Sequence, residues 1–217
     1  MMQVYNLQDE NSILNRYIAE IRDHDIQNDP IRFRKNMERI SEILAYEISK
    51  SFDYATEHVQ TPLGIATIAL PTDQLVIASI LRAGLSMHNG FLNRFDRAEN
   101  AFVSAYREET ADHSVKIKVE YKACPDLTDK TVLIVDPMLA TGQSMALVYK
   151  SLLANGTPKK IIIASTIATP QALTYLETVL PATTSIWTAA IDPELNDKSY
   201  IIPGLGDAGD LAYGKKL

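Results

Sequence analysis

An acidic side chain followed by a compact loop stands in the middle of this chain. Asp136 ends the apolar run 132–135, and the segment ATGQS at 140–144 is rich in small and hydroxyl residues. Pro137 cannot donate a ladder hydrogen bond, so the strand must stop there. A turn of this kind at the start of a helix presents backbone N–H groups and hydroxyls to one point, where they can bind phosphate. The sequence therefore predicts a phosphate site with one carboxylate beside it.

This loop differs from the commoner phosphate loops. It lacks the Lys that GxxxxGK[ST] places after the glycine, and it lacks GxGxxG. Taken alone, the segment is also compatible with an ordinary strand-to-helix connection that carries a Ser or Thr cap.

Arginines follow other apolar runs. Arg82 comes directly after the run 75–81 and precedes Ala83 and Gly84. An unpaired buried charge is costly, so Arg82 needs an anionic partner, and its planar fork suits bidentate phosphate binding. Arg107 closes the run that begins at Ala101. For Arg107 a surface ion pair with one of the glutamates that follow it is the alternative.

Composition narrows the class of protein. The chain has 217 residues, 46% of them hydrophobic, and a net charge of -6. A basic surface for nucleic acid is not expected, and no apolar stretch is long enough to cross a membrane. The single cysteine, Cys124, cannot form an internal disulfide, and it is interpreted as a loop residue. A cytoplasmic protein without a nucleic-acid or membrane partner is expected.

Strand and helix patterns alternate along the chain. Amphipathic spacing predicts opening helices over 13–21 and 33–48, and helices over 145–155 and 170–179. Apolar runs predict strands over 75–81, 101–107, 132–135, 160–167 and 184–191, with short strands over 54–67 and one strand of a projecting hairpin within 111–127. The expected fold is α/β, a parallel β-sheet with helices on both faces and the ligand site at the carboxyl ends of the strands.

Three segments resemble one family closely. ILRAG at 80–84, VDPMLATG at 135–142 and YIIPGLGDAGD at 200–210 are similar to segments of uracil phosphoribosyltransferases, of the type I phosphoribosyltransferase family. The resemblance covers roughly 25–214, apart from 52–75 and the hairpin. It implies a single domain over 1–217, with a flexible hood at about 108–127 and a uracil-binding lid at about 189–214.

The resemblance implies conversion of uracil and phosphoribosyl diphosphate (PRPP) into uridine monophosphate (UMP) and diphosphate, a step of pyrimidine salvage. The implied catalytic residues are Asp136, Arg82, Arg107 and Asp207. The implied PRPP-binding residues are Arg82, Arg107, Asp136, Pro137, Met138, Leu139, Ala140, Thr141, Gly142, Gln143, Ser144 and Asp207. The implied uracil-binding residues are Ile201, Gly206, Asp207 and Ala208.

Further expectations follow from the same resemblance. Mg²⁺ is expected to bind mainly through PRPP and water, which requires no dedicated metal site in the protein. A homodimer or homotetramer is expected, with GTP as an effector. A PRPP- or uracil-sensing RNA-binding regulator and a catalytically silent paralogue of the same fold are the alternative functions.

Two departures from the family pattern bear on these expectations. The phosphate loop reads TGQS where relatives usually read TGGS, and a positive φ at Gln143 would be strained, whereas a helical φ would not. The hood sequence also differs from the Pro-rich, aromatic one of relatives. Its His113 is interpreted as a solvated loop residue, with catalysis as the alternative.

Overall fold

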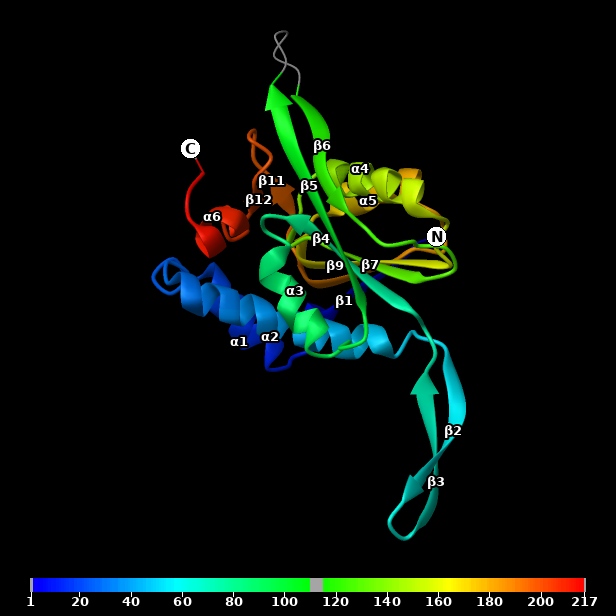
Figure 1. Ribbon diagram of the computed structural model, residues 1–217. Helices are drawn as coiled ribbons and strands as arrows, with labels where there is room; N and C mark the ends of the chain where they lie inside the picture. The colour runs from blue at the N-terminus through cyan, green and yellow to red at the C-terminus, as the bar shows by residue number, and fades with distance from the viewer. Residues whose placement is uncertain (1, 110–114, 217) are drawn as a thin grey trace.

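The centre of the molecule is a mostly parallel sheet (Figure 1). The computed structural model describes residues 2–109 and 115–216, without the side chains of 105–119. The strand order is β1-β10-β9-β7-β4-β5-β6, with β8 paired to β9. Neighbours are parallel except β5 and β6, which form an antiparallel hairpin at one edge. This confirms the expected fold class.

The strands of this sheet are β1 (Gln3–Asn6), β4 (Leu75–Leu81), β5 (Glu99–Glu109), β6 (Val115–Ala123), β7 (Thr131–Val135), β8 (Met138–Leu139), β9 (Lys160–Ala168) and β10 (Ser185–Ile191). The helices are α1 (Leu14–Arg22), α2 (Pro30–Ser49), α3 (Leu85–Leu92), α4 (Gln143–Leu152), α5 (Pro170–Val179) and α6 (Ala208–Tyr213). Short 3-10 turns lie at Leu7–Asp9 and Leu153–Asn155. Among the helices in the described part of the chain, none is long and apolar enough to cross a membrane.

Alternate residues of the central strands pack on opposite faces of the sheet. In β7, Leu133 and Val135 join the core under α1, α2 and α3, whereas Val132 and Ile134 join the core under α4 and α5. Figure 1 shows these helix groups on either side of the sheet. Burial on both faces explains why the central strands are continuous apolar runs and not alternating ones.

Some elements differ from the sequence prediction. The chain opens with β1, a four-residue edge strand whose side chains are largely exposed, and the amphipathic helices follow it. The predicted helix 145–155 begins earlier, at Gln143, and its last residues form the 3-10 turn. The predicted helices do not include α6, which forms over 208–213 with Asp207 as its N-cap. Short capped helices carry too weak a periodic signal to be recognised.

Two hairpins extend from the sheet. β2 (Tyr54–Thr61) and β3 (Gly64–Pro71) pair only with each other and form an arm that points away from the body of the molecule (Figure 1). The β5–β6 hairpin contains the segment predicted as the hood, at about 108–127. Its first strand, β5, begins at Glu99 and is also a strand of the central sheet. His113 lies outside the described residues.

The opening helices are joined by a polar network at their interface. Glu20 of α1 accepts from Arg32 of α2 through both carboxylate oxygens at 2.8 Å and from Asn36 at 2.7 Å. These bonds to Arg32 and Asn36 lower the pKa of Glu20 to about 2. The cluster of Arg32, Arg34 and Lys35 in the sequence is typical of a solvated helix face, but the structure shows that Arg32 holds α1 against α2.

Candidate active site

Two charged side chains meet because their strands are neighbours. Asp136 follows β7 and Arg82 follows β4, and these strands pair in parallel up to Ser79 and Val135. The carboxyl ends of parallel strands open at the same edge of the sheet, so the residues that follow them lie close together. Asp136 and Arg82 accordingly line the same cavity.

The loop after Asp136 ends at the start of α4. Gly142 has a left-handed φ of 76°, and an added Cβ would lie 3.0 Å from Leu176 Cγ. Gly142 leaves α4 without a side-chain N-cap, and the described contacts at this end include only a long bond from Gln143 N to Thr141 Oγ1, at 3.5 Å. The N–H groups of its first turn have no partner within the helix, and the positive end of the helix dipole lies there. The helix start is therefore suited to an anion such as a 5′-phosphate.

Gln143 does not strain this loop. It is the first residue of α4, and the positive φ falls on Gly142. A side chain on a helical residue is unstrained, and that of Gln143 is exposed. The departure from TGGS therefore leaves the backbone geometry of the loop intact.

The first part of the loop is held by the sheet. Pro137 O accepts from Thr166 N at 3.1 Å and from Ile167 N at 2.9 Å, and Leu139 O accepts from Thr169 N at 3.1 Å. Thr169 Oγ1 also donates to Ala140 O at 2.7 Å. These backbone bonds position the loop rather than leaving its carbonyl groups free.

Arg82 is held from the C-terminal side of the molecule. Its Nη2 donates to Asp210 Oδ1 at 2.8 Å and its Nη1 to Gly214 O at 3.2 Å. Each of these nitrogens carries a second proton, so the guanidinium can still bind an anion in the cavity. The Leu81–Arg82 peptide is cis. At Gly84 an added Cβ would lie 2.6 Å from Ile80 O, which explains the glycine in this turn.

The C-terminal lid closes the other side of the site. It runs from β10 through a small pair of strands, β11 (Glu194–Leu195) and β12 (Ile201–Ile202), to α6. Asp207 Oδ1 accepts from Asp210 N at 3.0 Å as the N-cap of α6. Its other oxygen, Oδ2, lies 3.4 Å from Lys216 Nζ. Arg34 of α2 donates to Ala212 O at 2.6 Å and so fixes α6 to the opening helices.

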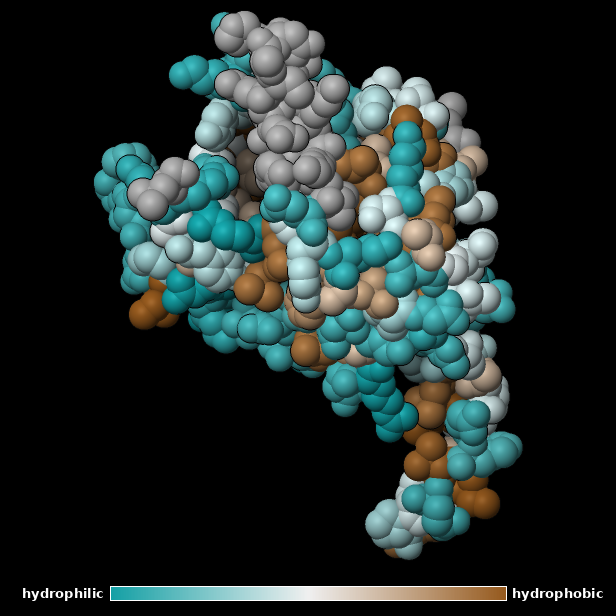
Figure 2. All heavy atoms as spheres, turned by 45° about the horizontal axis from the view of Figure 1, so that its top comes forward, coloured by the Kyte–Doolittle hydropathy of each residue, from teal (hydrophilic) through white to brown (hydrophobic). Residues whose placement is uncertain are grey.

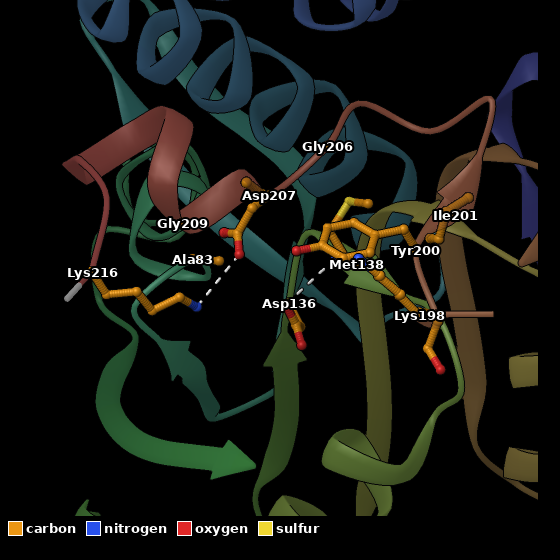
Figure 3. A pocket seen from close by; sticks show the side chains of 13 residues that line it. Ala83, Asp136, Met138, Lys198, Tyr200, Ile201, Gly206, Asp207, Gly209 and Lys216 are labelled. Atoms are coloured by element: carbon orange, nitrogen blue, oxygen red, sulfur yellow. Dashed lines mark hydrogen bonds and ion pairs between the residues drawn. The ribbon is translucent and has the colours of Figure 1, made fainter. Parts of the chain in front are cut away.

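Adjoining cavities lie between the loops and the lid. The larger, of about 350 Å³, is lined on one side by Asp136, Met138 and Ala140, and on the other by the lid (Figure 3). The smaller, of about 160 Å³, is lined by Arg82 and Ser144 among others. Asp136, Asp207 and Lys216 line both cavities, and Figure 3 shows Asp207 and Lys216 facing one another across from Asp136. The cavities therefore form one site.

The structure brings most of the predicted site residues together. The cavities are lined by Arg82, Asp136, Met138, Ala140, Ser144, Ile201, Gly206, Asp207 and Ala208. Pro137, Leu139, Thr141, Gly142 and Gln143 do not line either cavity but shape the loop that does. Arg107 lies in β5, and its side chain is outside the described residues, so its role stays a prediction.

Sequence reasoning missed several residues that line the site. They are Ala83, Lys198, Ser199, Tyr200, Gly209 and Lys216. Most of them adjoin a recognised motif, and that proximity was the available signal. Lys216 lies beyond every motif, and only folding of the C-terminal segment over α6 brings its ammonium group to Asp207.

The carboxyl group of Asp136 is unusual. Burial raises its pKa to about 7, and a single backbone N–H, that of Met138 at 3.4 Å, opposes this shift. The described contacts of Asp136 include no cationic side chain. A desolvated carboxylate without a counter-charge interacts strongly with any positive charge that develops beside it.

The described side chains do not form a metal centre by themselves. Within residues 2–109 and 115–216, no three His, Cys, Asp or Glu side chains are grouped to bind a metal ion. Asp136 and Asp207 both face the cavity and can add oxygen ligands to an ion that arrives with a phosphorylated substrate. The site thus fits Mg²⁺ that is bound mainly by a diphosphate.

The mostly parallel sheet, with Asp136 after β7 and the start of α4 beside it, has the fold of type I phosphoribosyltransferases. The fold is shared with a hypoxanthine phosphoribosyltransferase from Staphylococcus aureus, with a TM-score of 0.51 at 14% identity and coverage of 75% of this chain and 76% of that one. A second solved structure, the AQ2163 protein from Aquifex aeolicus, is much closer, with a TM-score of 0.86, 30% identity and 98% of each chain covered.

The chain belongs to the uracil phosphoribosyltransferase family. The family model of that name matches residues 9–215. A uracil phosphoribosyltransferase from Porphyromonas gingivalis is 57% identical over 216 residues, which cover 100% of both chains. One from Pyrobaculum arsenaticum is 40% identical over 184 residues, covering 83% of this chain and 86% of the relative.

The raised pKa of Asp136 predicts a pH-dependent stability. The folded protein binds this proton more tightly than the unfolded chain, whose carboxyl group has a pKa near 3.8. The resulting stabilisation is complete below that value and is lost as the pH rises through about 7. Asp136→Asn should therefore melt higher than the parent at pH 8, with about 2–4 °C for each kcal/mol recovered.

The measurement is a series of thermal melts of both proteins between pH 4.5 and 8. The exposed Asp126, in the loop before β7, provides the control Asp126→Asn. If the difference in melting temperature between the parent and Asp136→Asn stays constant over this pH range, the carboxyl group of Asp136 is not buried in its protonated form.

Proposed function

We propose that this enzyme transfers the phosphoribosyl group of PRPP to N1 of uracil and releases diphosphate, as a step of UMP salvage. The observation that carries the proposal is one cavity in which Asp136, the start of α4 and the lid meet. The C1′–O bond to diphosphate breaks, the C1′–N1 bond to uracil forms, and the N1 proton of uracil is released to water. Uracil is the nucleophile, so the protein supplies position and charge rather than an attacking group.

Each part of the site takes one part of PRPP. The uncapped start of α4 and the Ser144 hydroxyl bind the 5′-phosphate, and Asp136 accepts from the ribose hydroxyls. Arg82 lines the smaller cavity and binds the diphosphate. Arg107 is proposed as a second diphosphate ligand. Mg²⁺, when bound, neutralises part of the diphosphate charge, and Asp136 and Asp207 are the carboxylates positioned to contact it.

Asp136 acts on the charge that appears in the transition state. As the C1′–O bond breaks, the ribose ring becomes positively charged, and the adjacent carboxylate stabilises that charge. A nearby positive charge lowers the pKa of a carboxyl group, so the reaction itself favours the ionised form of Asp136. The stabilisation is thus larger in the transition state than in the ground state, which is the condition for catalysis.

Uracil is recognised by the lid backbone. Its edge offers an acceptor, a donor and an acceptor, and main-chain groups at Ile201, Gly206 and Ala208 line the cavity. Gly206 has a φ of 93° and nothing within 4 Å of an added Cβ, so its main chain is open to a ligand. Fixed amides cannot rotate to accept cytosine, which should be rejected by a factor of about 10⁴.

A cytoplasmic location and regulation by GTP complete the proposal. The location is an expectation from the composition and the effector an expectation from the family resemblance, and both stay predictions. The same assay that measures UMP formation, repeated with GTP, tests the effector.

The proposed reaction predicts a strict base preference. The purified protein with PRPP and Mg²⁺ should convert uracil to UMP and leave cytosine and hypoxanthine unreacted.

Asp136→Asn should remain folded and lose about 10²-fold or more in turnover, because it loses the charge beside C1′. Comparable rates with hypoxanthine, or undiminished turnover in Asp136→Asn, would refute the assignment.

Lys216 should assist diphosphate binding. Its ammonium group lines both cavities and is held near Asp207. Replacing it by methionine removes the charge and keeps the length, so Lys216→Met should raise KM for PRPP by roughly 3–10-fold, since one exposed charged contact contributes about 1 kcal/mol. KM for uracil should change little. Lys215→Met is the matched control, and an equal effect in the two variants would show that Lys216 has no specific role.

The proposed assembly is a homodimer or homotetramer. The β2–β3 arm supports this because its register places Val59, Ile68 and Leu70 on one side, all of them at least 38% exposed, with Glu57 opposite Ile68 as the charged residue of that side. Figure 2 shows hydrophobic side chains along the arm. A two-stranded hairpin is marginally stable alone, and an apolar patch of this kind is typical of an interface. A second copy of the chain is the proposed partner.

Charge on the apolar side of the arm should disrupt the assembly. Ile68→Glu is expected to shift the molar mass from light scattering towards that of one chain, because a carboxylate would be buried in the interface. Thr67 projects to the opposite side of the same strand, so Thr67→Glu is the control. An unchanged mass in Ile68→Glu would place the interface elsewhere.

A further inference from the structure

Selective base binding requires a lid whose backbone holds its place. Between Asp192 and Asp207 the lid contains only the two-residue strands β11 and β12. Short strands of this kind cannot fix main-chain groups to within a few tenths of an ångström. Contacts with the rest of the molecule must therefore hold the lid.

A buried ion pair lies at the point where the lid turns. Arg22, in the last turn of α1, donates through both terminal nitrogens to the two oxygens of Asp192, at 2.7 Å each. The side chains of Arg22 and Asp192 are only 20% and 6% exposed. The bidentate geometry gives direction as well as attraction.

Both backbone groups of one lid residue are bound to this pair. Gly204 N donates to Asp192 Oδ2 at 2.8 Å, and Gly204 O accepts from Arg22 Nη1 at 3.0 Å. Gly204 has a φ of 57°, and an added Cβ would lie 2.1 Å from Ile201 O, so the turn here is tight. The pair therefore fixes the position and the orientation of the peptide groups on either side of Gly204.

The pair is itself anchored to the sheet. Asp192 directly follows β10, and its N–H donates to Ala168 O at 2.9 Å, at the carboxyl end of β9. Ala168 pairs with Leu139 of the phosphate loop. The lid and the loop on the opposite side of the cavity are thus both attached to the carboxyl end of β9.

We propose that Arg22 and Asp192 are positioning residues for base recognition, because they clamp Gly204 between the uracil-facing residues Ile201 and Gly206. Neither side chain lines the cavity, so each acts through the lid backbone. Loosening the clamp weakens uracil binding and base selectivity and leaves the PRPP part of the site intact. This inference rests on the proposed function.

Arg22→Lys tests the clamp with little disturbance. Lysine retains the charge, so Asp192 is not left unpaired, but one ammonium group cannot reproduce the fork and the bond to Gly204 O together. KM for uracil should rise about 10-fold or more, since displacement of a positioned group by about 1 Å can cost up to 10²-fold. The lost contacts hold uracil equally in the ground state and in the transition state. The values of kcat and of KM for PRPP should therefore stay within about 2-fold of the parent.

Arg32→Lys is the matched control. Arg32 makes a bidentate pair with Glu20 between α1 and α2 at similar distances, and among the described residues it makes no hydrogen bond to the lid. The Arg32→Lys substitution should lower the melting temperature without changing KM for uracil. An equal rise in KM for uracil in both variants, or a change below 2-fold in Arg22→Lys, would contradict the proposal. The ion pair of Arg22 and Asp192 would then have a structural role only.

Hydrogen exchange gives an independent result even if Arg22→Lys does not fold or the parent shows no uracil activity. In the ligand-free parent, the Gly204 amide should exchange far more slowly than that of Lys215 near the chain end. In Arg22→Lys its protection should fall while that of β7 is unchanged. Rapid exchange of Gly204 in the parent would overturn the clamp, whereas slow exchange without UMP formation would refute the proposed function alone.

Discussion

The desolvation of one carboxyl group is the constraint on which this site depends. Asp136 lies at the end of the buried strand β7, and burial raises its pKa to about 7. Such a group destabilises the folded protein at neutral pH, and the cores on both faces of the sheet have to offset that cost. Under the proposed function, this carboxylate would interact strongly with the positive charge that develops on the ribose ring.

The cationic groups of the site are arranged by the C-terminal segment. Asp210 and the Gly214 carbonyl hold Arg82, and Asp207 lies near Lys216. The segment that would bind the base therefore also positions the charges that would receive the diphosphate. The bond from Arg82 to Asp210 thus joins α6 to the turn after β4.

The opening helices, in turn, support the lid. Arg22 of α1 binds Asp192 and Gly204, and Arg34 of α2 binds the Ala212 carbonyl. The ion pair of Glu20 and Arg32 keeps these helices together. A cation on an amphipathic helix is usually solvated, and the sequence pattern indicated that for Arg32 and Arg34. Partners far along the chain cannot be recognised from the spacing of a helix.

The sequence alone determined most strands, most helices and the residues at the strand ends, because continuous apolar runs and turn residues act locally. Asp136 and Arg82 were identified in this way, whereas the lid motif was identified by its resemblance to the family. Only the tertiary structure decided that Gly142, and not Gln143, takes the positive φ, that Lys216 reaches the cavity, and that Arg22 binds Gly204. These outcomes depend on contacts between segments up to 182 residues apart. Local patterns carry no information about such distant contacts, because packing of the whole chain creates them.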